Sequence, residues 1–488
     1  MKAKIKIPPI VSWLPVCLIV LLAAFFRLYR FAELFHWTMD EEYWSYLPYN
    51  IATGYHFPLI GGHIAGTGLY SGPLFVYLMA LPAKLFAGNP LGFGLTVAFL
   101  GIINTFLLFY VGRKIFNYAA GLIASFLYAA SFLMSLFDRH YWNASLTPIL
   151  ATLTIWFIWE IWHKRVKFAI PLAAVLALAF HAHGTGMALL LFTLIAWIYF
   201  RLPLKSRFVV IAIVLFILLQ TPLAIFELRH NFINSRALAG YITTSSGGAY
   251  PVGTRLLAIV SGFGSSTSRL FYFPANDLAI EQTLCPAYYP RRGISPWWVD
   301  ILLVMTGIFL VYRGRNVPAI RLLLLLVFST LAGLIIYKGN LPEYFFEPGF
   351  VPLFLLCGFT LEPLAGKKFG RVLLLGALGI FAVLNLTNLN RARRSFSYNV
   401  KIEAVRVAIG QVGKLPFVLE AKSHDACEIY GFRYLFSYFG VEPARSYMDP
   451  YFSWLYDKKI PVLPPEKLVE FNVQPENIRL IVDTLPGK

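Results

Sequence analysis

Long apolar runs separated by short polar segments dominate this chain. The first run covers residues 10–26 and ends at Arg27. The later runs fall near residues 91–112, 118–137, 144–162, 167–182, 184–200, 207–226, 297–313, 319–337, 349–364 and 371–389. Because a helix needs about 20 apolar residues to cross a bilayer, this pattern predicts about eleven membrane-spanning helices.

One further apolar run, residues 73–87, is shorter and contains Pro82 and Lys84. If it crossed the bilayer, Arg113, Lys114 and every later basic cluster would face outward. If it does not cross, all these clusters face the cytoplasm, as the positive-inside rule requires. We therefore predict a juxtamembrane helix at the outer interface, with the amino terminus in the cytoplasm and the carboxyl terminus outside.

Three of the predicted outer segments are longer than simple turns. Residues 30–90 hold the acidic cluster Asp40, Glu41 and Glu42, an expected surface helix over 43–52 and a Gly-rich loop over 61–72. Residues 227–296 form a second long outer segment, whose Ser- and Gly-rich stretch 243–248 favours mobility. In the third segment, residues 391–488, the apolar fraction drops. There, 401–412 predicts an amphipathic helix, and 416–421 and 478–482 predict strands, so we expect a small soluble α/β domain.

Composition and charge support a multi-pass membrane protein. Of the 488 residues, 58% are hydrophobic and only 14% are charged, which excludes an ordinary soluble domain. The net charge of +18 is typical of nucleic-acid partners, but the basic residues lie in short clusters between apolar runs. Anionic lipid head groups are therefore the expected counter-charge, and no nucleic-acid partner is predicted.

The first apolar run also resembles a signal peptide, and we interpret it as an uncleaved signal-anchor. The four cysteines predict no disulfide framework or zinc site. Cys17 and Cys357 fall in apolar runs, whereas Cys285 and Cys427 fall in outward segments and could pair.

Candidate catalytic residues lie at or near the outer ends of different spans. Carboxylates at a membrane surface are costly unless they bind a cation, a basic partner or a reacting proton. Each group also has a structural interpretation. Asp138 and Arg139 can form a local ion pair at a helix end, and His181 and His183 point to different sides of a helix, which makes a poor metal pair. Their common depth favours a reaction at the membrane boundary.

A resemblance to a known family appears in these motifs. Met39-Asp40-Glu41 after the first span, followed by Ser71-Gly72-Pro73-Leu74, resembles the first outer loop of the GT-C glycosyltransferases. The similarity is greatest to the family 39-like group, which includes protein O-mannosyltransferases and lipid A aminoarabinose transferases. Further matches, within residues 10–390, are Arg139-His140-Tyr141-Trp142-Asn143, the segment 178–184, Phe226-Glu227-Leu228-Arg229-His230 and Glu343-Tyr344-Phe345-Phe346-Glu347-Pro348.

The resemblance implies an all-α GT-C transmembrane catalytic domain over residues 1–390, with juxtamembrane helices in the first outer loop. It also implies sugar transfer from a polyprenyl-phosphate donor to an acceptor protein, lipid or glycan at the outer face of the plasma membrane. Asp40 would be the general base, and Glu41 would position the acceptor or a cation. A single displacement of this kind inverts the configuration at the sugar.

The same resemblance implies roles for other outer residues. Arg139, Arg229 and Lys338 are the candidates for binding the donor phosphate, whose charge grows as it leaves. The candidate substrate-binding residues are Asn143, His181, His183, His230, Glu343 and Tyr344. Many relatives have an aspartate where this chain has Asn143, so metal use stays open. No cofactor is certain; a divalent cation would be held by Asp40 and Glu41.

Two other functions fit parts of the sequence. A transporter or flippase of a lipid-linked saccharide would also span the membrane many times, but such proteins tend to have repeated halves and polar residues near mid-membrane. A catalytically inactive relative could act as a sensor or scaffold through its outer domain. Release of polyprenyl phosphate from a labelled donor by the purified protein distinguishes the enzyme from a flippase.

Overall fold

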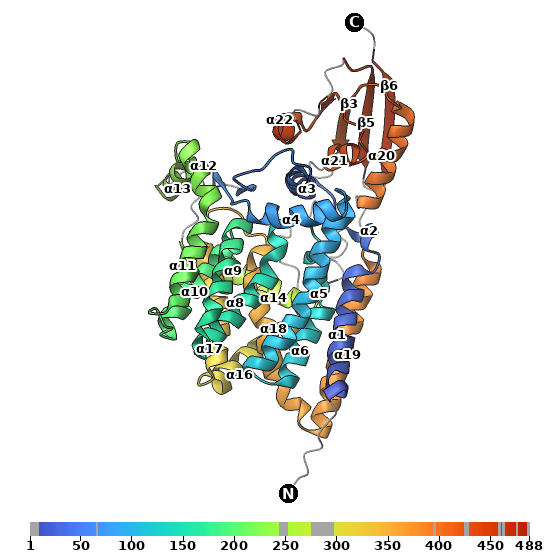
Figure 1. The fold of residues 1–488 in the computed structure, drawn as a ribbon. Coiled ribbons are helices and arrows are strands. Elements are labelled where there is room, and N and C mark those ends of the chain that lie inside the picture. Colours follow the sequence, from blue (N-terminus) through green and yellow to red (C-terminus); the bar gives the residue numbers. More distant parts are fainter. Residues whose placement is uncertain are drawn as a thin grey trace.

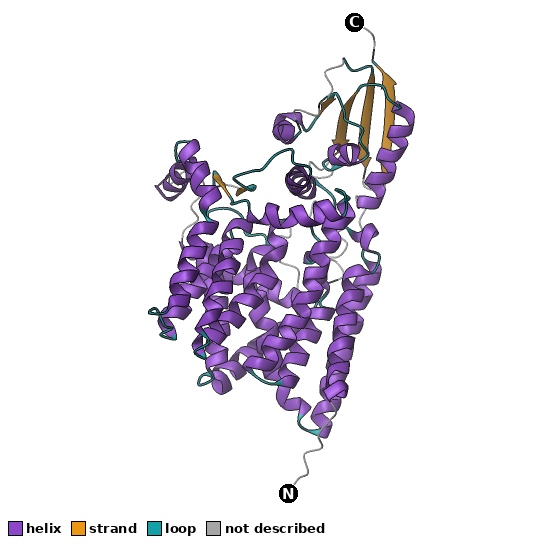
Figure 2. Cartoon of the chain, viewed as in Figure 1, coloured by secondary structure: helices purple, strands orange, loops and turns teal. Residues whose placement is uncertain are grey.

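The computed structural model describes residues 9–64, 67–243, 252–274, 297–393, 397–423, 429–456, 460, 464–474 and 477–485. The chain forms a bundle of long helices, a layer of short elements across one end of it, and a small domain beyond that layer (Figure 1). The sheet of the small domain is clearly separated from the helical bundle (Figure 2). The amino terminus lies at the opposite end of the bundle from this domain.

The bundle helices coincide with the apolar runs. They are α1 (Pro9–Leu28), α5 (Pro90–Ile115), α6 (Tyr118–Ala130), α7 (Phe132–Phe137), α8 (Thr147–Trp162), α9 (Ala169–Ala182), α10 (Gly186–Tyr199), α11 (Arg207–Leu219), α12 (Thr221–Arg229), α16 (Trp297–Gly314), α17 (Pro318–Ile336), α18 (Glu347–Ala365) and α19 (Lys368–Arg391). The short 3-10 helices η1 (Asn143–Leu146), η2 (Val166–Phe168) and η3 (Glu343–Phe346) precede α8, α9 and α18.

Five helical stretches of the described chain are long and apolar enough to cross a membrane, or six if the bent pair α11–α12 is one span. Several shorter apolar helices, among them α6, α9 and α10, complete the bundle. The structure is thus that of a membrane protein with many apolar helices. The count of about eleven spans stays a prediction.

Two predicted spans are interrupted. The run 118–137 breaks at Ser131, whose extended backbone separates α6 from α7 and whose side chain caps α7 by accepting from Met134 N. The Phe132 amide exposed by this break donates to Asn385 Oδ1 at 2.9 Å, so α19 satisfies it. The run 207–226 bends by 40° between α11 and α12.

Small residues let the central helices approach closely. A Cβ added to Gly112 of α5 would lie 2.8 Å from Gly121 Cα of α6, and one added to Gly358 of α18 would lie 2.3 Å from Ala120 O. Helices in membranes associate through such close van der Waals packing, because lipid tails offer no hydrophobic driving force between them. These contacts place α6 between α5 and α18.

The layer across the end of the bundle comes from the first predicted outer segment. It contains α2 (Phe31–Leu34), α3 (Met39–Ala52), the hairpin of β1 (His63–Ile64) with β2 (Leu69–Tyr70), and α4 (Leu74–Leu85). α4 lies across the bundle helices rather than along them (Figure 1), which agrees with a non-spanning run 73–87. The surface helix predicted over 43–52 begins earlier, at Met39, so the acidic cluster lies inside it.

The segment 227–296 contains more helix than its sequence predicted. After α12 it forms α13 (Ile233–Thr243) and the 20-residue helix α14 (Val252–Phe271). α14 is not a surface loop, because Arg255 and Arg269 on it are buried. The predicted mobile stretch 243–248 lies, from residue 244 on, outside the described residues, as do Cys285 and Cys427.

The C-terminal domain has a four-stranded mixed sheet in the order β4-β3-β5-β6. β3 (Phe417–Ser423) runs parallel to β4 (Arg445–Ser446) and β5 (Lys467–Gln474), and β5 forms an antiparallel hairpin with β6 (Asn477–Thr484). The helical elements are α20 (Tyr398–Val412), α21 (Phe432–Tyr438), α22 (Asp449–Phe452) and η4 (Ser453–Leu455). The predicted helix and both predicted strands are present; β4, β5 and α21 were not predicted.

Candidate active site

The first turn of α3 is built around a capping box. Thr38 precedes the helix, and its backbone N–H donates to Glu41 Oε2 at 2.9 Å while its hydroxyl donates to the same oxygen at 3.2 Å. Such a Thr-x-x-Glu pattern satisfies donors that a helix start would leave unpaired. Asp40, Glu41 and Glu42 therefore all lie at the positive end of the helix dipole, which favours carboxylates there.

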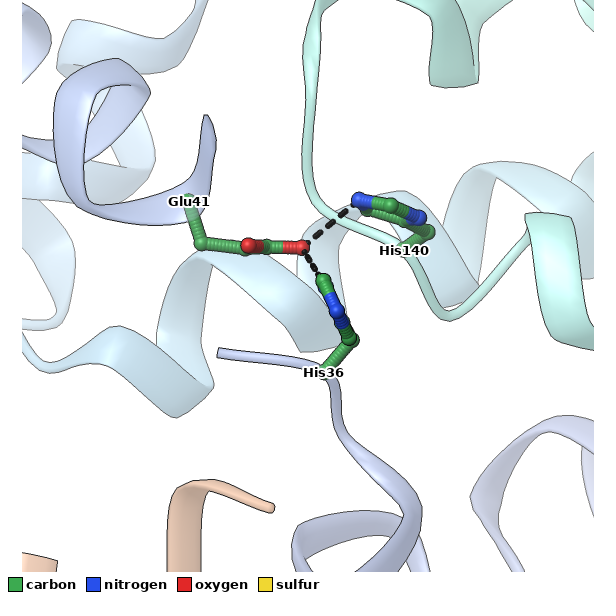
Figure 3. Close-up of side chains that lie close together, drawn as sticks. All are labelled: His36, Glu41 and His140. Atoms are coloured by element: carbon green, nitrogen blue, oxygen red, sulfur yellow. Dashed lines mark hydrogen bonds and ion pairs between the residues drawn. The ribbon is translucent and has the colours of Figure 1, made fainter. Parts of the chain in front are cut away.

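The three carboxylates point into different surroundings. Glu41 is fully buried, and its Oε1 lies 2.7 Å from His36 Nδ1 and 2.7 Å from His140 Nε2 (Figure 3). Glu42 is also buried but bonds to the C-terminal domain. Asp40 alone of the three is exposed. The side chain that solvent and a substrate can reach is thus Asp40.

The surroundings move the two neighbouring pKa values apart. The protein packed around Asp40 raises the pKa of its carboxyl to about 6, and the charge of Glu41 adds to this effect although one side of Asp40 stays open to solvent. Burial would also raise the pKa of Glu41, but His36 and His140 outweigh it and hold that pKa well below its usual range. Glu41 is therefore a fixed anion, whereas Asp40 can exchange a proton near neutral pH.

His36, Glu41 and His140 also have the chemistry of a metal site. Among the described residues they form a buried group of three ligand atoms that lie within 4.8 Å of one another. Two imidazoles with one carboxylate suit Zn²⁺ or another first-row transition metal better than Mg²⁺ or Ca²⁺, which prefer oxygen ligands. Of the two residues named from the sequence for a cation, the group contains Glu41 and does not contain Asp40. The residues present fit a cation of this kind.

A row of rings connects this cluster to two predicted substrate-binding residues. The His140 ring stacks on Trp142 with the centroids 4.0 Å apart, and Trp142 meets Tyr344 edge-on at 4.3 Å. Tyr344 in turn contacts His183 at 5.4 Å. Residues from four separate segments of the chain are thereby brought together. Burial lowers the pKa of His183 to about 4, so its imidazole is neutral near pH 7.

Asn143 and His181 lie at the end of α9, close to the layer that crosses the end of the bundle. Asn143 Nδ2 donates to Ala182 O at 2.5 Å, and His181 Nε2 pairs with Gln220 Oε1 at 2.8 Å. A Cβ added to Gly72 would lie 2.0 Å from His181 Nδ1. The Ser-Gly-Pro motif therefore needs glycine because α9 approaches it so closely.

The three basic residues proposed for the donor phosphate have different surroundings. Arg139 is buried, and its Nη2 donates to Phe26 O at 2.5 Å and Tyr29 O at 2.9 Å, which ties it to the end of α1. Lys338 is half-buried, and its ammonium donates to Tyr241 O and lies over the Tyr241 ring. Arg229 is exposed at the end of α12.

The remaining predicted residues fall into two places. His230 is exposed beside Arg229, and its ring stacks on Phe226 at 4.2 Å. Glu343 is fully buried and accepts from Arg269 of α14 at 2.6 Å. Near it, Glu347 is buried at the start of α18, and neither of its carboxylate oxygens has a hydrogen-bond partner in the described part of the chain.

Sequence reasoning missed two kinds of residue at this site. His36 was not singled out, although a histidine five residues before Glu41 could have indicated a partner or a shared cation site for that carboxylate. Arg269 and Arg255 were missed because their segment was interpreted as a loop. Arg255 donates to Leu334 O at 3.3 Å and Gly339 O at 2.8 Å, which joins α14 to the end of α17.

Solved structures with a similar arrangement are membrane glycosyltransferases. The chain is similar to ArnT from Cupriavidus metallidurans bound to undecaprenyl phosphate, with a TM-score of 0.57, 12% identity, and 94% of this chain and 92% of that chain covered. It is also similar to the Archaeoglobus fulgidus oligosaccharyltransferase tethered with an acceptor peptide, with a TM-score of 0.54, 13% identity, and 94% of this chain and 69% of that chain covered.

No protein-family model matches the sequence, and no curated protein matches it. At such low identity the likeness shows the fold. ArnT and the oligosaccharyltransferase are both members of the GT-C superfamily, and their similarity extends over almost the whole of this chain. The resemblance read from the short motifs is therefore confirmed at the level of the fold: this chain has the GT-C fold.

Proposed function

We propose that this protein is a membrane glycosyltransferase that moves a sugar from a polyprenyl-phosphate donor to an acceptor at the outer membrane face. The observation that carries the proposal is the exposed Asp40 carboxyl, with its pKa raised to about 6, beside the fixed anion Glu41. The shared fold with a protein bound to undecaprenyl phosphate supports a lipid-phosphate donor. The acceptor is a hydroxyl-bearing protein, lipid or glycan.

The proposed reaction is one displacement at the anomeric carbon. The acceptor O–H gives its proton to the Asp40 carboxylate, and the acceptor oxygen forms a bond to the anomeric carbon. The bond from that carbon to the phosphate oxygen breaks at the same time, and polyprenyl phosphate leaves with the electron pair. Attack and departure on opposite sides of the carbon invert its configuration.

The phosphate can leave without a proton from a general acid, provided that nearby positive groups stabilise the negative charge that develops on it. Arg229 is exposed and has the fork of donors that suits phosphate. Arg139 and Lys338 use part of their donors on backbone carbonyls. We keep all three as proposed donor-binding residues, and Arg229 is the one whose substitution should disturb the fold least.

The proposed substrate-binding residues are Asn143, His181, His183, His230, Glu343 and Tyr344. Tyr344 has the strongest support, because Trp142 links its ring to His140 and so to Glu41. His183 contacts the same ring. A neutral imidazole and a phenol can both exchange hydrogen bonds with sugar hydroxyls.

We also propose that any divalent cation of the site is held by Glu41 with His36 and His140, and not by Asp40. A bound cation would supply positive charge near the developing anion. Metal analysis of the purified protein tests this assignment. Stoichiometric zinc or manganese that is lost from His140→Ala but kept in Asp40→Asn agrees with it, and loss from Asp40→Asn alone contradicts it.

The orientation is proposed from the basic clusters and the bundle. We place the amino terminus in the cytoplasm and α3, α4 and the C-terminal domain outside a plasma (inner) membrane. In the structure, α3 and the amino terminus lie at opposite ends of the bundle (Figure 1). Reporter fusions or labelling that found residue 40 on the cytoplasmic side would contradict the proposal.

The decisive experiment measures release of polyprenyl phosphate from a labelled donor in detergent. Asp40→Asn should lower the rate by roughly 10²- to 10⁴-fold, the usual contribution of a general base. Glu33→Gln is the matched control, because Glu33 is an exposed carboxylate of the same layer that pairs only with nearby Arg30 among the contacts described. Wild-type protein that moves the lipid without cleaving it would instead be a flippase.

A further inference from the structure

One face of α3 is occupied by the C-terminal domain. Glu42, Tyr46 and Asn50 recur every four residues, so they lie along one side of the helix. All three are buried. Tyr46 Oη lies 2.9 Å from Ser437 Oγ, and Asn50 Nδ2 donates to Leu455 O at 2.8 Å. We call these three residues the docking face.

Glu42 makes the most specific contact of the docking face. Its Oε2 accepts from Gly431 N at 2.9 Å and its Oε1 accepts from Tyr434 N at 2.8 Å. Gly431 has φ +99°, and a Cβ added there would lie 2.8 Å from Trp37 Cδ1. Glycine is therefore required at 431, both for its backbone conformation and for the close approach to Trp37.

The residue before the α3 cap is also held by the C-terminal domain. Trp37 Nε1 donates to Gly431 O at 2.8 Å, and the buried Lys401 ammonium donates to Trp37 O at 2.8 Å and Tyr430 O at 2.7 Å. A buried ammonium is costly unless its protons are bonded, so these contacts fix the distance between the two parts of the chain. Both ends of the first turn are thus held from outside the bundle.

We propose that the C-terminal domain positions the first turn of α3 for catalysis, and that Glu42 is the positioning residue that transmits this effect. The inference rests on the proposed role of Asp40. It gives Glu42, the third acid of the cluster, a function different from its two neighbours. Asp40 reacts and Glu41 is a fixed anion, whereas Glu42 joins the helix to residues 431–434.

The need for such positioning follows from α3 itself. It has only 14 residues and contains Pro48, and isolated helices of this length are marginal in water. Its rigidity must therefore come from packing. Asp40 is two residues from Glu42 in the same turn, so a loosened docking face moves the base directly. Misplacement by about 1 Å can cost roughly 100-fold in rate.

Glu42→Gln tests the inference, because it keeps the size of the side chain but turns one acceptor into a donor that faces a backbone N–H. We expect faster deuterium exchange in α3 and α21, measured by mass spectrometry on the full-length protein in detergent. We also expect kcat to fall roughly tenfold or more, with the donor KM little changed. The control is Glu403→Gln, which removes an exposed carboxylate of α20 paired with Arg406.

The two measurements separate this inference from the proposed function. Asp40→Asn should lower the transfer rate by roughly 10²- to 10⁴-fold with normal deuterium exchange; if it keeps the wild-type rate, the base assignment fails whatever Glu42 does. If Glu42→Gln changes neither exchange nor kcat, or changes exchange with full kcat, the positioning role is wrong. Should Glu42→Gln fail to fold, Tyr46→Phe removes a single bond of the docking face and must show the same two effects in a weaker form.

Discussion

The two ends of the helical bundle treat charge differently. At the end near the amino terminus, Glu160 pairs with Lys114 and Arg165, whose side chains are 26% and 57% exposed. At the other end, Arg27 pairs with Asp138 at 2.7 Å, and their side chains are 0% and 3% exposed. Glu160 itself is buried, so the difference lies in the basic partners: Lys114 and Arg165 keep contact with solvent, whereas Arg27 does not. An ion pair with one partner in solvent contributes little, whereas a pair with both partners enclosed is costly to assemble and to break. At the end that carries the candidate active site, removing one partner of an ion pair should therefore lower the free energy of unfolding the most.

Breaking the enclosed pair should give the largest effect on stability. Arg27→Met leaves the Asp138 carboxylate buried without its main partner and also removes the bond from Arg27 Nη1 to Ala129 O. We expect the free energy of unfolding to fall by about 3–5 kcal/mol. Denaturant titration of the purified protein in mixed micelles measures it. A loss below about 1 kcal/mol, the range of an exposed pair, would remove the contrast between the two ends.

Removing the Glu347 carboxylate at the same end should change the free energy of unfolding in the opposite direction. Glu347 is enclosed and, within the described residues, unpartnered, so Glu347→Met should raise the free energy of unfolding by about 1–3 kcal/mol. The same titration measures this gain. Transfer activity measured in parallel shows whether this buried carboxylate serves catalysis. Residues that destabilise the fold are often retained at active sites because activity needs them. Destabilisation by this variant would contradict our view of Glu347.

The pH profile sharpens the comparison by testing a single group. A general base must be ionised, and protein packed around Asp40 raises its pKa to about 6. As the pH falls below 6, kcat/KM should therefore drop about tenfold per unit, and above pH 7 it should level off. Any residual activity of Asp40→Asn should lack this limb. A profile that is flat between pH 5 and 7 would exclude Asp40 as the titrating base.

The smallest change in the free energy of unfolding is expected at the end of the bundle near the amino terminus. Arg165→Gln removes a mostly exposed partner and leaves Lys114 on Glu160, so the free energy of unfolding should change by less than about 1 kcal/mol. Raising the salt concentration should shrink the effect further. A change as large as that of Arg27→Met would mean that exposure does not distinguish the two ends.

Much of the bundle could be predicted, because runs of apolar residues long enough to span a membrane have few other structures available. The position of the run 73–87 followed from the sidedness of the basic clusters, together with its short length and its Pro82 and Lys84. The start of α3 could also have been read from Thr38 and Glu41, which form a capping-box signature. α14 could not, because a helix rich in Ser and Gly resembles a loop until its neighbours bury it.

The candidate site could be read from the sequence only where its residues lie in a local motif. Asp40 and Glu41 follow the first span and belong to a short recognisable motif, whereas the placement of His140 beside Glu41 depends on how α1, α3 and α7 pack. The contact of Glu42 with Gly431 joins residues 389 positions apart, and no local pattern encodes it. Sequence reasoning therefore names the proposed reactive group more readily than the contacts that hold it in place.

The contact between Glu42 and Gly431 has a consequence for how the protein is made. A ribosome adding about 5–20 residues per second needs roughly 20 to 80 s to travel from the codon for Glu42 to the one for Gly431. During that interval the membrane already holds the first outer helix with its partner still unsynthesised. On the proposed positioning role of Glu42, a chain that stalls before residue 431 would remain in the bilayer with Asp40 unaligned and without transfer activity.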